Sequence, residues 1–389
     1  MNQLELIATA TFGLEAIVAR EVKALGYENV KTGNARVVFS APMEAICRAN
    51  LWLRCADRVL IKVGEFKALT FDELFEGTKA LPWEEWLPVD ASFPVDGKSV
   101  KSKLFSVSDC QAITKKAIVE RLKRKYHRQW FDETGPQYQI EVALQNDLAT
   151  LTIDTSGPGL HKRGYRKLTG TAPLKETLAA ALINLSFWGP ERVLIDPCCG
   201  TGTIPIEAGL IGLNIAPGLN RDFAAQKWPQ LPDDLWRKAR AEALDRIRRD
   251  RKLKIIGTDI DPEVLSLARY HCKQAQLDRQ IHLQQLPLSE LRNSHKYGCV
   301  ICNPPYGERL GETAKVEQLY REMSKVFKPL ETWSFYILTS YTAFERLFGR
   351  RADRRRKLYN GRIECQYYQF YGPRPPKRAE SGPSEIENE

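Results

Sequence analysis

Two short stretches of this sequence carry residue types that could do chemistry. The first is Asp196-Pro-Cys-Cys-Gly-Thr-Gly-Thr203, and the second is Asn303-Pro-Pro-Tyr306. Each follows a short apolar run that is typical of a buried strand. A glycine turn at a strand end lets the backbone approach a ligand closely, and the helix after it offers free N–H groups. We therefore expect a ligand loop and a reactive loop at one edge of a sheet.

The spacing in the first loop excludes two common nucleotide sites. Position 205 is proline, so the Gly-x-Gly-x-x-Gly pattern of dinucleotide binding is missing, and no Gly-Lys-Ser/Thr is present for a nucleoside triphosphate. A ligand with an amino-acid end fits what remains, because Asp196 could meet an ammonium group and backbone N–H groups a carboxylate.

A second acidic stretch, Gly257-Thr-Asp259-Ile-Asp261, ends the next predicted strand. The Asp259 carboxylate could accept both hydroxyls of a ribose, whereas Asp261 is expected to cap the helix that begins at Pro262. An acidic residue after a strand is more often a helix cap than a ligand, and that alternative stays open for either residue taken alone. Two such loops on consecutive strands favour S-adenosylmethionine as the cofactor.

The reactive loop has the groups needed to hold a planar amino nitrogen. Such a nitrogen is a poor nucleophile because its lone pair is delocalised, but the Asn303 side-chain oxygen and the Pro304 carbonyl could accept its two protons. Pro304 and Pro305 would stiffen the loop, and Tyr306 offers a ring for stacking a flipped base. The motif leaves adenine N6, cytosine N4, guanine N2 and a glutamine amide open, and a plain Asn-Pro turn is the alternative.

The helices and strands of the first 155 residues are predicted from the spacing of apolar residues. Residues 1–65 have a β-α-β-α-β rhythm, with helical patterns from Gly13 and Met43, that resembles a small ferredoxin-like unit. Residues 66–155 predict further helices and strands: helices 71–78 and 108–125, and strands 91–95, 139–145 and 149–154. Thr155-Ser-Gly-Pro-Gly159 interrupts both patterns, so we expect a linker over 156–173.

The second half predicts an α/β fold with a doubly wound parallel sheet over residues 174–371. Strands alternate with helices: strands 192–196, 254–259, 280–284, 299–303 and 334–339, and helices 174–185, 203–212, 262–276 and 313–328. Residues 372–389 are rich in Pro, Lys, Arg, Ser and Glu and are expected to be a disordered tail.

Charge and composition limit the partners. The 389 residues carry 58 Lys+Arg against 48 Asp+Glu, a net charge of +10 that favours a polyanionic partner. Basic clusters at 115–128, 237–254 and 350–357, with Arg163 and Arg166 as further candidates, favour RNA; a solvated surface is the alternative for each cluster.

The expected location of the protein in the cell follows from two patterns that the sequence lacks. No run of about 18 apolar residues and no signal-peptide pattern is found, so a cytoplasmic protein outside the membrane is expected. Nine scattered cysteines do not form a disulfide framework, and no metal site is expected.

These stretches resemble the class I S-adenosylmethionine-dependent methyltransferases, and more narrowly the THUMP-domain RNA methyltransferases. The narrower resemblance also rests on Ala8–Glu15, His161–Arg166, Gly170–Glu176 and Asn214–Gly218. It is strongest to the bacterial enzymes that methylate guanine N2 in large-subunit (23S) ribosomal RNA. It implies a Rossmann-like catalytic sheet behind a ferredoxin-like domain (1–65) and a THUMP domain (66–155) that bind RNA.

The resemblance assigns roles to single residues. It implies that the cofactor is bound by Asp196, Cys198, Gly200, Thr201, Gly202, Asp259 and Ile260. It implies that the guanine is held by Asn303, Pro304, Pro305 and Tyr306. One stretch departs from the pattern: where these enzymes place an Asp near the adenine, residues 284–289 read Gln-Gln-Leu-Pro-Leu-Ser.

Three other functions stay open. The chain could modify guanine N2 in tRNA, or adenine N6 in DNA, although the N-terminal half argues against a DNA enzyme. It could also be a ribosome-assembly factor that binds RNA without catalysis. The sequence does not decide whether naked ribosomal RNA or an assembly intermediate is the partner, nor the oligomeric state.

Overall fold

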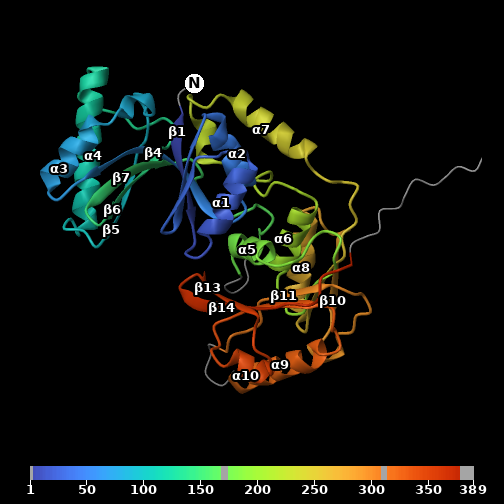
Figure 1. Cartoon of the computed structure of the whole chain (residues 1–389). Helices are drawn as coiled ribbons and strands as arrows, with labels where there is room; N and C mark the ends of the chain where they lie inside the picture. Colours follow the sequence, from blue (N-terminus) through green and yellow to red (C-terminus); the bar gives the residue numbers. More distant parts are fainter. Residues whose placement is uncertain (1–2, 168–173, 308–312, 377–389) are drawn as a thin grey trace, which may run out of the picture.

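The computed structural model describes residues 3–167, 174–307 and 313–376. Its two seven-stranded sheets lie one in each half of the chain (Figure 1). The predicted α/β fold of the second half, behind an N-terminal α+β region, is confirmed. The tail beyond residue 376 and part of the linker, 168–173, lie outside the described residues.

The first part of the N-terminal sheet has the strand order β2-β3-β1-β4, with two helices between the strands. Neighbouring strands are antiparallel, and this is the βαββαβ order of a ferredoxin-like unit. The elements are β1 (Leu4–Ala10), α1 (Glu15–Ala24), β2 (Val30–Gly33), β3 (Arg36–Ala41), α2 (Glu44–Trp52) and β4 (Ala56–Lys67). The sequence prediction missed β2, because this strand has four mostly exposed residues and no apolar alternation.

The remaining strands extend the same sheet through β4. This strand of 12 residues pairs with β1 along one side and with β7 along the other. The added elements are α3 (Phe71–Ala80), η1 (Trp83–Glu85), β5 (Val95–Val100), α4 (Val107–Tyr126), β6 (Gln139–Gln145) and β7 (Leu148–Asp154). The predicted strand 91–95 was wrong: the strand begins where the predicted one ends, because continuous pairing with β6 starts only at Val95. The predicted boundary at 65/66 falls within β4, and the domain limits stay a prediction.

The C-terminal sheet has the order β10-β9-β8-β11-β12-β14-β13. The run from β10 to β12 is parallel, as predicted, and β14 and β13 add an antiparallel hairpin at one edge. The strands are β8 (Leu194–Asp196), β9 (Ile255–Asp259), β10 (Ile281–Gln285), β11 (Cys299–Cys302), β12 (Ser334–Thr339), β13 (Arg354–Asn360) and β14 (Ile363–Phe370). The hairpin was missed because its first strand, Arg-Arg-Arg-Lys-Leu-Tyr-Asn, reads as a basic cluster.

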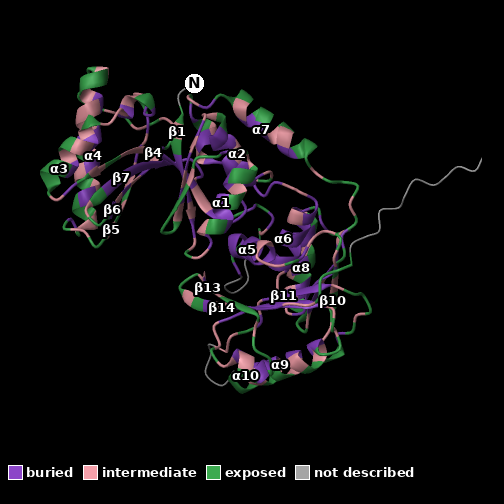
Figure 2. Cartoon of the chain, in the orientation of Figure 1, coloured by how far each residue is buried: buried purple, intermediate pink, exposed green. Residues whose placement is uncertain are grey.

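The helices of this half were largely predicted from their apolar periodicity. They are α5 (Glu176–Asn184), α6 (Thr203–Gly212), η2 (Ala224–Lys227), α7 (Asp233–Asp245), α8 (Pro262–Gln274), η3 (Leu288–Glu290), α9 (Thr313–Phe327) and α10 (Phe344–Phe348). Figure 2 shows α5 buried, whereas α7 is exposed along its outer side. We predicted no helix or strand between residues 212 and 254, so α7 was missed.

One hydrophobic core runs through both halves. Buried residues from Leu6 in β1 to Tyr367 in β14 belong to the same cluster. Polar contacts reinforce it: Gly218 N–H donates to the Leu51 carbonyl at 2.9 Å, and Arg48 of α2 pairs with Glu242 of α7 at 2.9 Å. The N-terminal half is therefore packed against the catalytic half.

Candidate active site

The ligand loop leaves the sheet at its topological switch point. Strand order reverses between β8 and β11, which pair in parallel, so the loops after Asp196 and Cys302 leave neighbouring strand ends. A crevice at such a point is the usual ligand site of an open α/β sheet. The sequence-predicted ligand loop and reactive loop are thus adjacent.

Two glycines give the ligand loop its shape. Gly200 and Gly202 have φ of +51° and +83°, a region that favours glycine. Space around Gly200 is open, since no atom lies within 4 Å of where a Cβ would be. Gly202 is followed directly by α6, whose first residue is Thr203. The loop therefore presents bare backbone to the crevice at the start of a helix.

Asp196 is a buried carboxylate, with 2% of its surface exposed. It accepts the Cys198 N–H at 3.2 Å, and no described ion pair supplies it with a cation. Burial raises the pKa of this carboxyl well above its usual range, and the nearby Asp259 raises it further. An ammonium group bound beside Asp196 would remove that cost. The amino-acid end of S-adenosylmethionine fits this requirement.

Asp259, the last residue of β9, is hydrogen-bonded to the ligand loop that follows β8. Its Oδ2 accepts the Gly200 N–H at 2.9 Å, and its Oδ1 accepts the Asp261 N–H at 3.1 Å. Each carboxylate oxygen keeps a lone pair for a ribose hydroxyl. The neighbouring Ile260 is 70% exposed, although it is a large apolar residue. The predicted cap is confirmed: Asp261 accepts the Glu263 N–H at 2.8 Å, with Pro262 opening α8.

The other predicted cofactor residues lie in the same loop. Cys198 is half-buried, and its thiol pKa is raised by burial and then by Asp196, Asp259 and Glu322. Thr201 is also half-buried, and its carbonyl lies 3.2 Å from Nδ1 of His271. These contacts hold the loop, and the cofactor roles of Cys198 and Thr201 stay predictions.

The reactive loop is fixed by two tyrosines. The Tyr306 hydroxyl donates to Oδ1 of Asn303, and the Tyr320 hydroxyl donates to the Pro305 carbonyl at 2.9 Å. Tyr320 also lies 2.8 Å from Oγ1 of Thr339, the last residue of β12. Because a carbonyl oxygen accepts two hydrogen bonds, Asn303 can keep Tyr306 and still accept a substrate proton.

The missed hairpin reaches this loop. Burial raises the pKa of the Tyr306 phenol, the Cys365 thiol of β14 raises it further, and a hydrogen bond from Asn360 at the end of β13 lowers it. Sequence reasoning did not find Asn360 or Cys365, because neither belongs to a motif. Their position after the last parallel strand is the one clue that the sequence offers. A hairpin that follows β12 and pairs with it returns to the carboxyl edge of the sheet.

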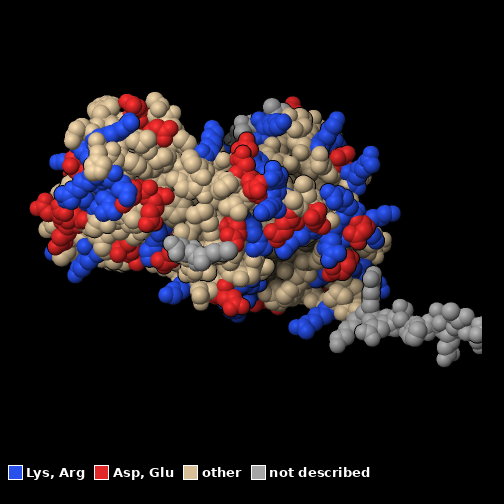
Figure 3. Space-filling model, turned by 90° about the horizontal axis from the view of Figure 1, so that it is seen from above, with Lys and Arg blue, Asp and Glu red and all other residues tan. Residues whose placement is uncertain are grey.

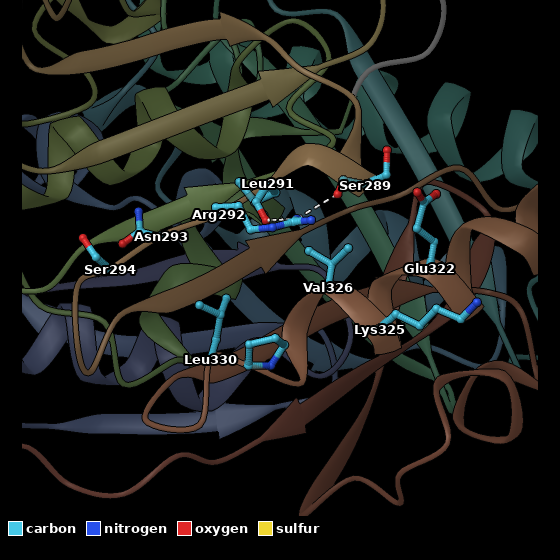
Figure 4. A pocket seen from close by; sticks show the side chains of 10 residues that line it. Ser289, Leu291, Arg292, Asn293, Ser294, Glu322, Lys325, Val326 and Leu330 are labelled. Carbon is cyan, nitrogen blue, oxygen red and sulfur yellow. Dashed lines mark hydrogen bonds between the residues drawn. The ribbon is translucent and has the colours of Figure 1, made fainter.

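The stretch 284–289 borders an open groove. Gln285 donates to the Ile260 carbonyl at 3.1 Å, which brings this stretch beside the exposed Ile260. A groove of about 730 Å³ begins at Ser289 and runs between the loop 289–294 and α9 (Figure 4). Glu322 lies at the same end of the groove as Ser289 and is close enough to Cys198 to raise the pKa of its thiol. Which residues contact an adenine stays a prediction.

Two of the expected RNA contacts were wrong. Arg163 is 3% exposed and pairs with the fully buried Glu207 of α6 at 3.4 Å. Arg166 pairs with Glu176 at 3.2 Å and donates to Oγ1 of Thr203 at 2.5 Å. Both arginines attach the linker to the catalytic half, because their partners, Glu207 and Glu176, are buried acids of helices α6 and α5.

The three basic clusters are partly neutralised. Figure 3 shows cations and acids side by side over the face in view. Lys115 pairs with Glu133 at 2.6 Å, and Arg121 pairs with Glu84 at 2.6 Å. Arg240 donates to two backbone carbonyls, which makes it a structural residue. The exposed cations outside the described ion pairs include Arg124, Lys125, Arg248, Arg249 and Lys252. RNA contact by the clusters stays a prediction.

The described residues offer neither a metal site nor a membrane span. In 3–167, 174–307 and 313–376, no group of three His, Cys, Asp or Glu residues could hold a metal ion, and no helix could cross a membrane. The nine cysteines all lie among these described residues, and none of them forms a disulfide. Cys299 and Cys302 have the C-x-x-C spacing of many metal sites, but both lie in β11, where residues three apart point to opposite faces.

Three family profiles match this chain: the RMKL-like methyltransferase domain over 163–369, the RlmL ferredoxin-like domain over 5–60 and the THUMP domain over 68–154. The chain belongs to the RMKL-like methyltransferase family. The resemblance inferred from the sequence is therefore confirmed.

Two relatives illustrate the range of the family. "Putative RNA methyltransferase YpsC" of Bacillus subtilis is 51% identical over 97% of this chain and 98% of its own length. "Ribosomal RNA large subunit methyltransferase K/L" of Legionella pneumophila is 33% identical over 93% of this chain. The match covers 52% of that longer relative, so the chain corresponds to about half of it.

Solved structures support the same assignment. A protein from Listeria monocytogenes, named a "predicted N6-adenine-specific DNA methylase", has 54% identity and a TM-score of 0.92 over 96% of this chain and 97% of its own. SMU.472, named a "putative methyltransferase complexed with SAH", has 47% identity and a TM-score of 0.92 over 97% and 100%. SAH is S-adenosylmethionine without its methyl group, so these neighbours indicate S-adenosylmethionine as the cofactor.

Proposed function

We propose that this chain is an S-adenosylmethionine-dependent RNA methyltransferase that transfers a methyl group to guanine N2, in large-subunit (23S) ribosomal RNA. The observation that carries the proposal is the pairing of β8 with β11, which puts the Asp196 loop beside the Asn303 loop. A THUMP domain in the same chain and relatives named as ribosomal RNA methyltransferases support RNA as the substrate. A cytoplasmic location goes with that substrate.

The cofactor supplies an electrophilic methyl group on a sulfonium. In the proposed reaction, Asp196 holds the ammonium end and Asp259 the ribose, while the open backbone at Gly200 receives the rest of the amino-acid moiety. Asn303 accepts one proton of the guanine amino group through Oδ1, and the Pro304 carbonyl accepts the other. The nitrogen lone pair is thereby directed at the methyl carbon, and orientation supplies most of the rate enhancement.

The Tyr306 hydroxyl gives the Asn303 amide its direction. Because this hydroxyl donates to Oδ1, the amide presents an acceptor and not its NH₂ group. A nitrogen–carbon bond forms as the carbon–sulfur bond breaks, and the extra proton leaves the amino nitrogen for water. No strong base is required, because the proton can leave after methyl transfer.

Other targets are distinguished by one experiment. The enzyme is incubated with labelled S-adenosylmethionine and total RNA from cells that lack this modification, with a parallel reaction on DNA, and the nucleosides are then separated. We expect N2-methylguanosine in large-subunit ribosomal RNA. The same nucleoside in tRNA would move the substrate, and label in DNA alone would favour adenine N6 methylation, the activity for which the Listeria protein is named. Cofactor binding without transfer to any nucleic acid would favour a glutamine amide as the acceptor, and absence of cofactor binding would favour the assembly-factor alternative.

A further inference from the structure

The ferredoxin-like domain places one aromatic residue beside the catalytic edge. Phe12, in the turn after β1, is 54% exposed. Its ring lies edge-on to Tyr359 of β13, with centroids 6.1 Å apart and planes at 74°. A ring that is half exposed contributes less hydrophobic stabilisation than a buried one, and part of its surface stays accessible to a partner.

The turn that carries Phe12 is held firmly in place. Gly13 has a φ of +91°, and a Cβ there would lie 3.0 Å from the Lys357 carbonyl, so only glycine fits this approach to β13. The Gly13 N–H donates to Glu15 at 2.9 Å, and Glu15 also accepts the Ala35 N–H at 3.0 Å. The Phe12 ring is therefore positioned by its backbone.

Phe12 reaches the reactive loop through the hairpin. Tyr359 precedes Asn360, whose side chain bonds to Tyr306 of the reactive loop. Both residues lie at the end of β13, which returns to the carboxyl edge of the sheet. Phe12 thus lies beside the strand end that contacts the reactive loop, although it comes from the other half of the chain.

One cation lies beside this aromatic pair, and three further cations lie close to one another along β13 and α1. Nζ of Lys357 lies 5.6 Å from the centre of the Tyr359 ring and pairs with Glu364. Arg20, Arg354 and Arg356 form no ion pair within the described part of the chain. Arg356 has Arg354 and Arg20 close enough to lower the pKa of its guanidinium, after burial, which is the larger cause. An unpaired cluster of this kind attracts phosphate groups.

We infer that Phe12 and Tyr359 stack an unpaired nucleotide that neighbours the target base, with Lys357 close to its phosphate and the three arginines available to the phosphates of the adjoining nucleotides. The inference rests on the proposed RNA substrate. An aromatic ring with a free face accepts any base, and basic side chains nearby neutralise the backbone. The ferredoxin-like domain would then form part of the active site, besides any RNA capture by the THUMP domain.

The test compares Phe12→Ala with a matched control. Phe187 is 55% exposed, but it lies at the opposite edge of the sheet and its ring packs on Tyr371 at 4.7 Å. Methyl transfer to ribosomal RNA lacking the modification is measured for the wild type, Phe12→Ala, Phe12→Tyr and Phe187→Ala, together with cofactor affinity and thermal midpoint.

We expect Phe12→Ala to raise KM for RNA by roughly 5- to 150-fold, the range for loss of one stacked base, with kcat changed less than KM. Phe12→Tyr should restore KM, and Phe187→Ala should match the wild type. Cofactor affinity should not change in any variant.

Three outcomes would overturn the inference while the proposed function stands: KM of Phe12→Ala within twofold of an active wild type, an equal rise for Phe187→Ala, or no rescue by tyrosine. A wild-type enzyme that binds cofactor but methylates no RNA would refute the proposed function itself.

Discussion

The oxygen of the Asn303 side chain has to serve two donors in the proposed reaction. One is the Tyr306 hydroxyl, which already donates to it, and the other is the amino group of the substrate. The tyrosine hydrogen bond therefore orients the amide before the substrate arrives. Such preorganised polar groups are worth more in a buried site than in water.

Replacement of Asn303 by alanine should abolish this arrangement. We expect Asn303→Ala to lower kcat by about 10²–10³-fold, the usual loss for one positioned polar group, with cofactor affinity unchanged. Transfer of labelled methyl and calorimetric titration of S-adenosylmethionine measure the two quantities. Asn293→Ala, in the groove beside α9, is the control and should keep wild-type activity. Activity of Asn303→Ala within a few-fold of wild type would remove Asn303 from its proposed role.

His161 gives the protein a pH-dependent stability. Burial, and after it the charges of Lys175, Lys162, Arg163 and Arg221, together lower the pKa of this imidazole to about 4. Because the ordinary pKa is near 6.5, the unfolded chain takes up a proton between pH 6.5 and 4 that the folded protein does not. Stability from the neutral His161 is thus present above pH 6.5 and is lost as the pH falls through this range.

His161→Gln should reduce that loss. Between pH 7 and 5, we expect the free energy of unfolding of the wild type to fall by up to about 2 kcal/mol more than that of His161→Gln. Urea unfolding at the two pH values measures the difference. An equal pH dependence in both proteins would show that His161 titrates normally in the folded state.

At the level of single residues, the sequence predicted the positions of those site residues that belong to a recognisable motif. Asp196, Gly200, Asp259 and Asn303 were expected at one sheet edge, and the structure brings them there. Arg163 was misread as an RNA contact because its partner, Glu207, lies 44 residues away in a helix. A buried ion pair across such a separation leaves no local pattern.

Among the secondary-structure elements, apolar periodicity decided what could be predicted. Most helices that bury one face, and the parallel strands of the C-terminal sheet, were found to within a few residues, whereas α7 was missed. The short exposed β2 and the cationic β13 were missed, because their strand pairing is a long-range property that residue types do not encode.

The segment after α7 allows a test of the basic clusters. Arg248 and Arg249 are exposed, and neither belongs to a described ion pair. We expect Arg248→Glu with Arg249→Glu to weaken RNA binding several-fold or more and to reduce the slope of log K against log salt by about 2, if each arginine meets one phosphate. Fluorescence titrations at several salt concentrations measure both.

A double reversal on α8, Arg269→Glu with Lys273→Glu, changes the net charge equally outside the clusters and is the control. If both double variants bind RNA alike, the segment after α7 contributes only long-range charge. Cofactor affinity should be the same in all three proteins.

For the whole molecule, a buried ion pair joins the linker to the catalytic half. Arg163 donates to the Arg54 and Leu160 carbonyls and pairs with Glu207, which also accepts from Tyr165. Glu207 lies in α6, the helix that begins directly after the ligand loop. The network therefore connects the N-terminal domains to the element that supports the cofactor.

Removal of Glu207 should destabilise the entire chain. We expect Glu207→Leu to lower the free energy of unfolding by about 3–5 kcal/mol, because it leaves the Arg163 charge buried without a partner. Glu242→Gln breaks the half-exposed pair with Arg48 and should cost at most about 1 kcal/mol. Thermal and urea unfolding compare the two variants. A similar small loss in both would mean that water reaches Arg163.

The strand β13 also bears on how copies of this protein behave at high concentration. It is the outermost strand of the catalytic sheet, so one side of its backbone has no neighbouring strand among the described residues, and such an edge can recruit a strand from another molecule. Four consecutive cations, Arg354 to Lys357, lie on this strand, and the two without an ion pair among the described residues, Arg354 and Arg356, would repel the same edge of a second copy. The charge that is proposed to contact a polyanion therefore also opposes edge-to-edge association of copies of this chain. Variants that neutralise the strand to weaken RNA binding should be checked for solubility before their affinities are compared.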